Sequence, residues 1–171
     1  MFFIYAFMSF NNEIILFDVN NYFQQWYITN DDVMGGVSNS VIKITENGIA
    51  EFSGSVSTDN NGGFAMTRLP VNVKLKKYNS KIILRIKGDG KKYQLRIKSK
   101  RFQRYWYIYS FQTSNDIQEL EIPLKDFYPS YRGYRLNFEN FSDNSIEEIA
   151  ILISNKKNEK FNLHIEKISI R

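Results

Sequence analysis

The segment from Lys81 to Lys98 reads KIILRIKGDGKKYQLRIK and decides the fold class of this chain. Apolar and polar residues alternate on both sides of the central Gly88-Asp89-Gly90. Alternation with a period of two is typical of β-strands that bury one face. The Asp-Gly pair favours a tight turn, so the segment predicts a β-hairpin in which Lys81–Lys87 pairs with Tyr93–Lys98.

The same alternation continues through most of the chain. It predicts a second hairpin, in which Ser40–Thr45 and Ile49–Val56 are joined through Glu46-Asn47-Gly48. Pro123, Pro129 and Gly133 interrupt the pattern, so Leu124–Tyr134 is expected to be an irregular loop. No convincing helical stripe is present, and many short strands indicate an antiparallel sandwich or barrel. The remaining predicted strands are Phe64–Leu69, Arg104–Gln112, Ile117–Ile122, Ile146–Ser154 and Phe161–Ile170.

The composition excludes several classes of function. The 171 residues contain no cysteine and a single histidine. Thiol catalysis, thiolate metal sites and two-histidine metal sites are therefore excluded. A chain of this length fits one domain with an ordinary core. We find no serine in a nucleophile-elbow context, no dinucleotide fingerprint and no carboxylate pair placed for glycoside hydrolysis, so the sequence predicts no catalytic residue, no metal and no cofactor.

Positive charge is concentrated in residues 74–104, which hold thirteen lysines or arginines and one acid, Asp89. This stretch has a net charge of +12, whereas the rest of the chain has a net charge of −7 and the whole chain +5. Such a local field can attract an acidic protein, an anionic lipid or a nucleic acid. No nucleic-acid motif accompanies it, so nucleic acid ranks last among these partners.

The first sixteen residues are expected to form an N-terminal extension or a first strand, ahead of a domain over residues 17–171. Their apolar start is too short to cross a bilayer, and both Met1 and Met8 could serve as the initiator. It carries no basic residue, so it resembles neither a signal peptide nor a transit peptide. We therefore expect no transmembrane segment and a cytoplasmic protein.

Two glycine-containing loops stand out. The first combines acids, glycines and a hydroxyl group: Asn30, Asp31, Asp32, Met34, Gly35, Gly36 and Ser38. Its oxygens could bind Ca²⁺ or a sugar, or its acids could accept loop N–H groups while the glycines allow positive φ. The structural interpretation is favoured, because the spacing is not that of a known calcium cage. Gly62 and Gly63 precede Phe64 in a similar loop, predicted to be a turn.

An aromatic run adjoins the basic stretch. Alternation places Tyr105, Tyr107 and Tyr109 on one face of a strand and Trp106 with Ile108 on the other. The tyrosines could stack on a ligand, or Trp106 and Ile108 could be core while the tyrosines cover the sheet. The candidate binding face drawn from both segments is Arg85, Lys87, Arg96, Lys98, Arg104, Tyr105, Trp106, Tyr107 and Tyr109.

These segments together resemble the CIA30 family, the complex I intermediate-associated protein 30 domain. The resemblance runs over residues 17–171. Its most specific parts are Asn30–Ser38, Asn61–Ala65 with Arg68, Arg85–Tyr93 with its Gly88-Asp89-Gly90 turn, and Ile122–Phe127.

The resemblance implies an all-β jelly-roll sandwich of the galactose-binding type, with little helix. It also implies a non-catalytic module that binds a protein partner, such as an intermediate of a respiratory or membrane complex, in the manner of an assembly factor or chaperone. The alternative is a carbohydrate-binding jelly roll, which could hold a structural calcium ion. The sequence leaves open which face of the sandwich binds, and its composition suggests a bacterial source.

Overall fold

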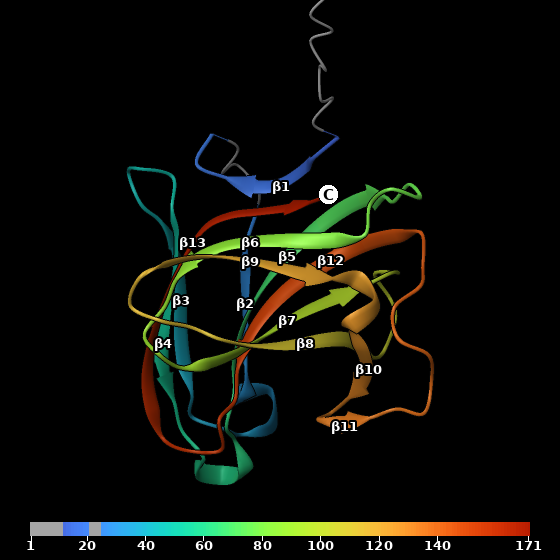
Figure 1. Cartoon of the computed structure of the whole chain (residues 1–171). Coiled ribbons are helices and arrows are strands. Elements are labelled where there is room, and N and C mark those ends of the chain that lie inside the picture. Colours follow the sequence, from blue (N-terminus) through green and yellow to red (C-terminus); the bar gives the residue numbers. More distant parts are fainter. Residues whose placement is uncertain (1–11, 21–24) are drawn as a thin grey trace, which may run out of the picture.

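The structure is a computed structural model that describes residues 12–20 and 25–171. Two antiparallel sheets pack face to face (Figure 1). The six-stranded sheet has the order β3 (Asn39–Ile44), β4 (Ala50–Val56), β13 (Glu159–Ile170), β6 (Lys81–Lys87) and β9 (Ile117–Pro123), and β1 (Ile14–Asp18) also pairs with β13. The seven-stranded sheet has the order β11 (Tyr134–Arg135), β10 (Tyr128–Tyr131), β8 (Trp106–Gln112), β7 (Lys92–Lys98), β12 (Ser145–Ile153), β5 (Ala65–Lys74) and β2 (Tyr27–Asn30).

The all-β sandwich expected from the sequence is confirmed. The described helical segments are three short 3-10 helices: η1 (Asp31–Met34), η2 (Asp59–Asn61) and η3 (Leu124–Asp126). None of the helical segments in residues 12–20 and 25–171 has the length and apolar character needed to cross a membrane. Strand β1 spans the boundary that the sequence places after residue 16, and residues 1–11 lie outside the described residues.

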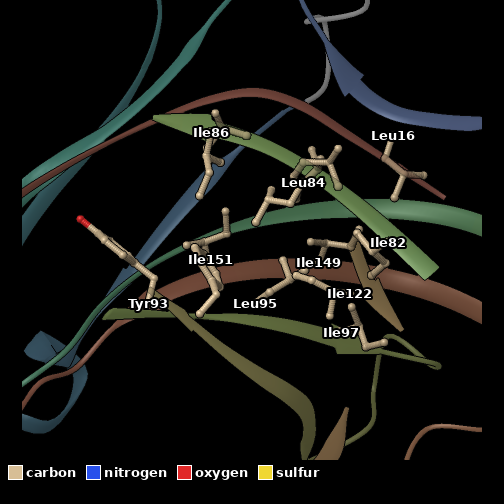
Figure 2. Close-up of a cluster of buried hydrophobic side chains, with 14 of the residues drawn as sticks. Leu16, Ile82, Leu84, Ile86, Tyr93, Leu95, Ile97, Ile122, Ile149 and Ile151 are labelled. Carbon is tan, nitrogen blue, oxygen red and sulfur yellow. The ribbon is translucent and has the colours of Figure 1, made fainter. Parts of the chain in front are cut away.

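The core lies between the two sheets. Alternate residues of β6 and β7 point toward one another across the interior (Figure 2). Ile82, Leu84, Leu95 and Ile97 are each fully buried. Burying such side chains contributes about 1.5–3 kcal/mol each, which makes this interior the main source of stability.

The predicted hairpin between Lys81–Lys87 and Tyr93–Lys98 is wrong. Strand β6 pairs with β13 and β9, whereas β7 pairs with β12 and β8. The Gly88-Asp89-Gly90 turn therefore carries the chain from one sheet to the other. The Asp89 carboxylate accepts hydrogen bonds from Lys91 N, Tyr93 Oη and Asn162 N of β13, which ties the turn to the six-stranded sheet. The other predicted hairpin is confirmed, since β3 pairs with β4.

The predicted irregular loop over Leu124–Tyr134 also contains regular structure. It begins with η3 and then forms β10 and β11. Pro129 lies opposite Tyr107 of β8, and its carbonyl oxygen accepts a hydrogen bond from Leu136 N. Proline is tolerated near the border of a sheet, where fewer ladder hydrogen bonds are required.

Candidate functional site

The two glycine loops meet around one carboxylate. Asp31 is 1% exposed. Its Oδ1 accepts a hydrogen bond from Ser38 N at 3.0 Å, and its Oδ2 accepts hydrogen bonds from Gly63 N at 2.6 Å and Phe64 N at 3.2 Å. The Ser38 hydroxyl also donates to Oδ2. The sequence did not predict that these loops would share a single acceptor.

Hydrogen bonding controls the ionisation of Asp31. Burial alone would raise the pKa of this carboxyl group, but the hydrogen bonds from Ser38, Gly63 and Phe64 outweigh burial and hold the pKa below its ordinary value. Among the described residues, no cluster of three or more histidine or acidic side chains could hold a metal ion. The contacts of Asp31 fit the interpretation in which the acid accepts loop N–H groups.

The glycines of these loops have distinct local roles. Gly35 has φ +85° and ends η1, whereas a Cβ at Gly36 would clash with the Asp31 carboxylate. A Cβ at Gly62 would lie 2.6 Å from Asp31 Oδ2. Asn30 Oδ1 accepts a hydrogen bond from Ser40 Oγ, and Asp32 is exposed. The two loops, residues 31–38 and 57–64, therefore join strand ends of one sheet to strand ends of the other through Asp31. They are called the clasp below.

The nine residues predicted to form one binding face do not lie together. Arg85 and Lys87 belong to β6 in the six-stranded sheet, and the Arg85 guanidinium pairs with Glu166 at 2.8 Å. Tyr105, Tyr107 and Tyr109 pack against the main core. Arg104 precedes β8 and is exposed. Only Arg96, Lys98 and Trp106 share the outer face of the seven-stranded sheet, because β6 and β7 separate into different sheets.

This outer face is crossed by a continuous row of cross-strand neighbours. A small residue, Ala150, lies in the middle of the row between two arginines, and a tyrosine lies at either end. The row passes through β2, β5, β12, β7, β8 and β10 as Tyr27, Arg68, Ala150, Arg96, Ile108 and Tyr128. Ala150 is fully buried, because the long side chains of its neighbours Arg68 and Arg96 can cover its small methyl group.

A buried glutamate organises one half of the outer face. Glu148 of β12 is 2% exposed. Its two oxygens accept hydrogen bonds from Arg68 Nε and Nη2, both at 2.8 Å, and Oε1 also accepts one from the Tyr27 hydroxyl. Lys98 Nζ lies 3.6 Å from Oε2. These contacts join β2, β5, β7 and β12.

The same network perturbs its titratable members. Burial would raise the pKa of Glu148, but hydrogen bonds from Arg68 and Tyr27 lower it below its ordinary value. Burial and the hydrogen bond to Glu148 raise the pKa of Tyr27 to about 12. Burial also lowers the pKa of Lys98. Glu148 is therefore ionised at neutral pH, and its single negative charge offsets one of the two positive charges of Arg68 and Lys98.

Cations cover the aromatic rings of this face. The Arg68 guanidinium lies 4.7 Å from the centre of the Tyr27 ring, and Lys98 Nζ lies 4.5 Å from that of Trp106. The Arg135 guanidinium lies 4.7 Å from the Tyr128 ring centre. Such contacts hold the rings in place. A cation therefore already occupies a face of each of these rings.

Arg96 differs from the other cations of this face. Its Nε and Nη2 donate to Gln94 Oε1 at 3.1 and 2.7 Å, and in the described part of the chain it forms no ion pair with a carboxylate. Burial lowers the pKa of Arg96 to about 10, against the opposing effect of Tyr128. The sequence marked Arg96 but missed Tyr27, Tyr128 and Glu148. Glu148 lies inside the mostly apolar segment 146–153. An acid in such a segment could have been used to predict a buried ion pair.

Comparisons with solved structures agree with this architecture. The family 11 carbohydrate-binding module of the cellulase Lic26A-Cel5E from Clostridium thermocellum matches with a TM-score of 0.67 and 20% identity, over 92% of this chain and 93% of that one. The same type of module in complex with a β-1,3-1,4-mixed-linked tetrasaccharide matches with a TM-score of 0.65 and 21% identity, over 92% and 94%. A family 29 carbohydrate-binding module matches with a TM-score of 0.56 and 6% identity, over 92% and 86%.

At these identities the likeness shows the fold, which is the predicted jelly-roll sandwich. A search of curated protein sequences finds no significant match. The family model described as complex I intermediate-associated protein 30 matches residues 15–165. This match covers nearly the whole chain, including the clasp around Asp31 and the outer-face residues Arg68, Arg96 and Glu148. The chain belongs to the CIA30 family.

Proposed function

We propose that this CIA30 domain is a non-catalytic binding module that holds a protein partner during assembly of a respiratory membrane complex. The family description supports the class of partner, since it refers to complex I intermediates. The outer face of the seven-stranded sheet is the proposed docking surface. It combines tyrosine, tryptophan and arginine, the residue types that contribute most energy at protein interfaces.

Arg96 is the observation that carries this proposal. A partly buried guanidinium without a carboxylate partner costs folding free energy. It also leaves N–H donors available beside Ile108 and Ala150, which are both buried. A carboxylate of a docked partner would complete the ion pair in a setting already shielded from water. The partner is therefore expected to present an acidic side chain flanked by apolar groups.

Affinity purification tests the proposal. Tagged protein from the source cells is captured at low and high salt, and retained proteins are quantified by mass spectrometry. The unmodified domain is expected to retain subunits of a respiratory membrane complex in a salt-sensitive manner. Arg96→Gln, which removes the charge and shortens the side chain but keeps it polar, is expected to reduce their retention about tenfold.

Lys87→Gln is the matched control, because Lys87 is an exposed cation on the opposite sheet. It removes the same charge and is expected to leave retention unchanged. Lys98 is unsuitable for this comparison, because its removal would also disturb Glu148. Equal retention by Arg96→Gln and the unmodified domain, or capture without any subunit of such a complex, would contradict the proposal.

Carbohydrate binding is the second candidate, supported by the shared fold with carbohydrate-binding modules. The cations over Tyr27, Trp106 and Tyr128 argue against it, because they occupy ring faces that a pyranose would use. Fluorescence of a Trp26→Phe variant reports on Trp106 alone, since the chain has two tryptophans. A saturable change with the mixed-linked tetrasaccharide would favour this candidate, whereas an unchanged signal is expected if the partner is a protein.

A further inference from the structure

A second candidate site lies at one end of the sandwich and shares no residue with the outer face. An open cavity of about 620 Å³ lies here. It is lined by the loop between β5 and β6, by the end of β9 with η3, and by the segment before β12. Small-molecule sites typically fall between about 300 and 1,000 Å³. This cavity is called the end cavity below. Its lining includes four lysines, one acid, Asp143, and a group of apolar side chains.

The floor of the end cavity is the end of the hydrophobic core. Leu124 and Phe141 line it and belong to the main core cluster, where they are 6% and 4% exposed. Leu75 packs against the same cluster. This arrangement offers a rigid apolar surface to the carbon skeleton of a ligand.

Backbone hydrogen bonds hold the walls in place. Leu75 N donates to Asn144 O, and Leu124 N donates to Ser80 O, both at 2.8 Å. Phe141 N donates to Phe127 O at 2.9 Å. These bonds tie together three segments that are distant in the sequence, so the cavity exists without a ligand.

Asn79 helps to fix the wall of this cavity. It is 7% exposed, and its Oδ1 accepts a hydrogen bond from Lys76 N at 2.9 Å. This contact fixes the orientation of the amide. Its Nδ2 has no hydrogen-bond partner among the described residues. This nitrogen has almost no accessible surface, so Asn79 shapes the wall of the cavity from behind and offers no donor to a ligand.

The excess of positive charge around the end cavity favours a negatively charged ligand. Lys81 pairs with Glu121, whereas Lys76, Lys77 and Lys125 form no ion pair within residues 12–20 and 25–171. Lys76 Nζ lies 5.9 Å from the centre of the Tyr78 ring, and the three lysines together carry more positive charge than one carboxylate requires. A phosphate monoester carries about −1.5 to −2 charges at pH 7 and offers three acceptor oxygens. We propose that the end cavity binds a phosphate monoester attached to an apolar or ring-bearing organic group.

Nuclear magnetic resonance titration of the full chain tests this site. The probes are phenyl phosphate, which joins a phosphate monoester to an apolar ring, and phenol, which lacks the phosphate. Phenyl phosphate is expected to cause saturable amide shifts confined to residues 75–81, 123–125 and 141–144. Phenol is expected to cause none at the same concentration.

Charge-matched variants identify the lysines involved. Lys77→Glu with Lys125→Glu is expected to weaken phenyl phosphate binding about tenfold or more. Lys43→Glu with Lys87→Glu makes the same change in net charge at exposed positions of the six-stranded sheet and is expected to retain affinity. Equal weakening in both variants, shifts spread over lysines throughout the chain, or no saturation would overturn the proposal.

Vesicles distinguish the two sources of such a phosphate. Sedimentation with phosphatidylcholine vesicles containing phosphatidic acid, lost in the Lys77/Lys125 variant, would assign the site to a lipid headgroup. Saturable binding of phenyl phosphate without sedimentation would assign it to a free phosphorylated molecule. Either assignment requires saturable binding of phenyl phosphate, and its absence overturns the site.

Discussion

Gly35 and Gly36 are neighbours in the sequence but are required for different reasons. Gly35 has φ +85° and open space around its Cα, so Gly35→Ala is expected to cost about 1 kcal/mol of backbone strain. Gly36→Ala would place a methyl group against the Asp31 carboxylate and is expected to cost about 2–3 kcal/mol. Urea denaturation of both variants measures the difference.

Gly35→Asn is the control, because asparagine tolerates the left-handed region and should recover part of the lost stability. A larger loss for Gly35→Ala than for Gly36→Ala would show that contact with Asp31 is not the constraint on this loop.

Arg96 is a single side chain at which binding and stability are expected to oppose each other. Arginine is charged at neutral pH in the folded and unfolded states, and its lowered folded-state pKa means that the folded state disfavours this charge. Arg96→Met is therefore expected to stabilise the fold by about 1 kcal/mol while partner retention falls. Thermal denaturation provides the measurement.

Arg85→Met is the comparison, since Arg85 pairs with Glu166 and is more exposed. Its effect on stability is expected to stay within about 0.5 kcal/mol. Destabilisation by Arg96→Met would indicate that packing of the arginine stem outweighs the cost of its charge.

At the scale of elements, Glu148 connects four strands of the seven-stranded sheet. Glu148→Gln would leave the partly buried Arg68 and Lys98 without their counter-charge. Breaking a buried pair from one side is expected to destabilise by about 3–5 kcal/mol. Chemical denaturation of Glu148→Gln and of the adjacent Glu147→Gln, whose side chain is less buried, tests this expectation. Similar losses in both variants would be inconsistent with a special role for Glu148.

For the whole molecule, several carboxylates link folding to pH, and three of them lie in the loops around Asp31, in the Gly88-Asp89-Gly90 turn and on the outer face of the seven-stranded sheet. The pKa values of Asp31, Asp89 and Glu148 are lowered in the folded state, because hydrogen bonds outweigh the effect of burial. A lowered folded-state pKa contributes stability above the unfolded value of about 4, and this contribution disappears as the pH falls through the folded-state pKa. The free energy of unfolding is therefore expected to fall between about pH 5 and pH 2.

Asp31→Asn isolates one of these contributions. Measured by urea denaturation, the stability difference between the unmodified protein and Asp31→Asn is expected to shrink as the pH falls, because the lowered pKa of Asp31 stabilises the folded state only while the carboxylate is ionised. Asp59→Asn removes an exposed acid in the same loops and is the control for the loss of one negative charge. A constant difference for Asp31→Asn at every pH would show that its ionisation is not coupled to folding.

The sequence by itself determined which residues of each strand share a face. Alternation correctly separated Tyr105, Tyr107 and Tyr109 from Trp106, because successive side chains in a strand point to opposite sides whatever the strand pairs with. It also determined the all-β class and the hairpin between β3 and β4, whose Asn-Gly turn acts over a few residues. The resemblance to CIA30, carried by short motifs, agreed with the family match over residues 15–165.

Only the tertiary structure decided which strands pair and which face of β8 points inward. A Gly-Asp-Gly turn fits a hairpin or a crossing between sheets, and the bond from Asn162 N to Asp89 depends on β13, far along the chain. Both faces of β8 are aromatic, so hydrophobicity could not choose between them. Because the sheets separate β6 from β7, one basic stretch in the sequence became the ion-paired Arg85 on one sheet, Arg96 on the other and three of the four lysines of the end cavity.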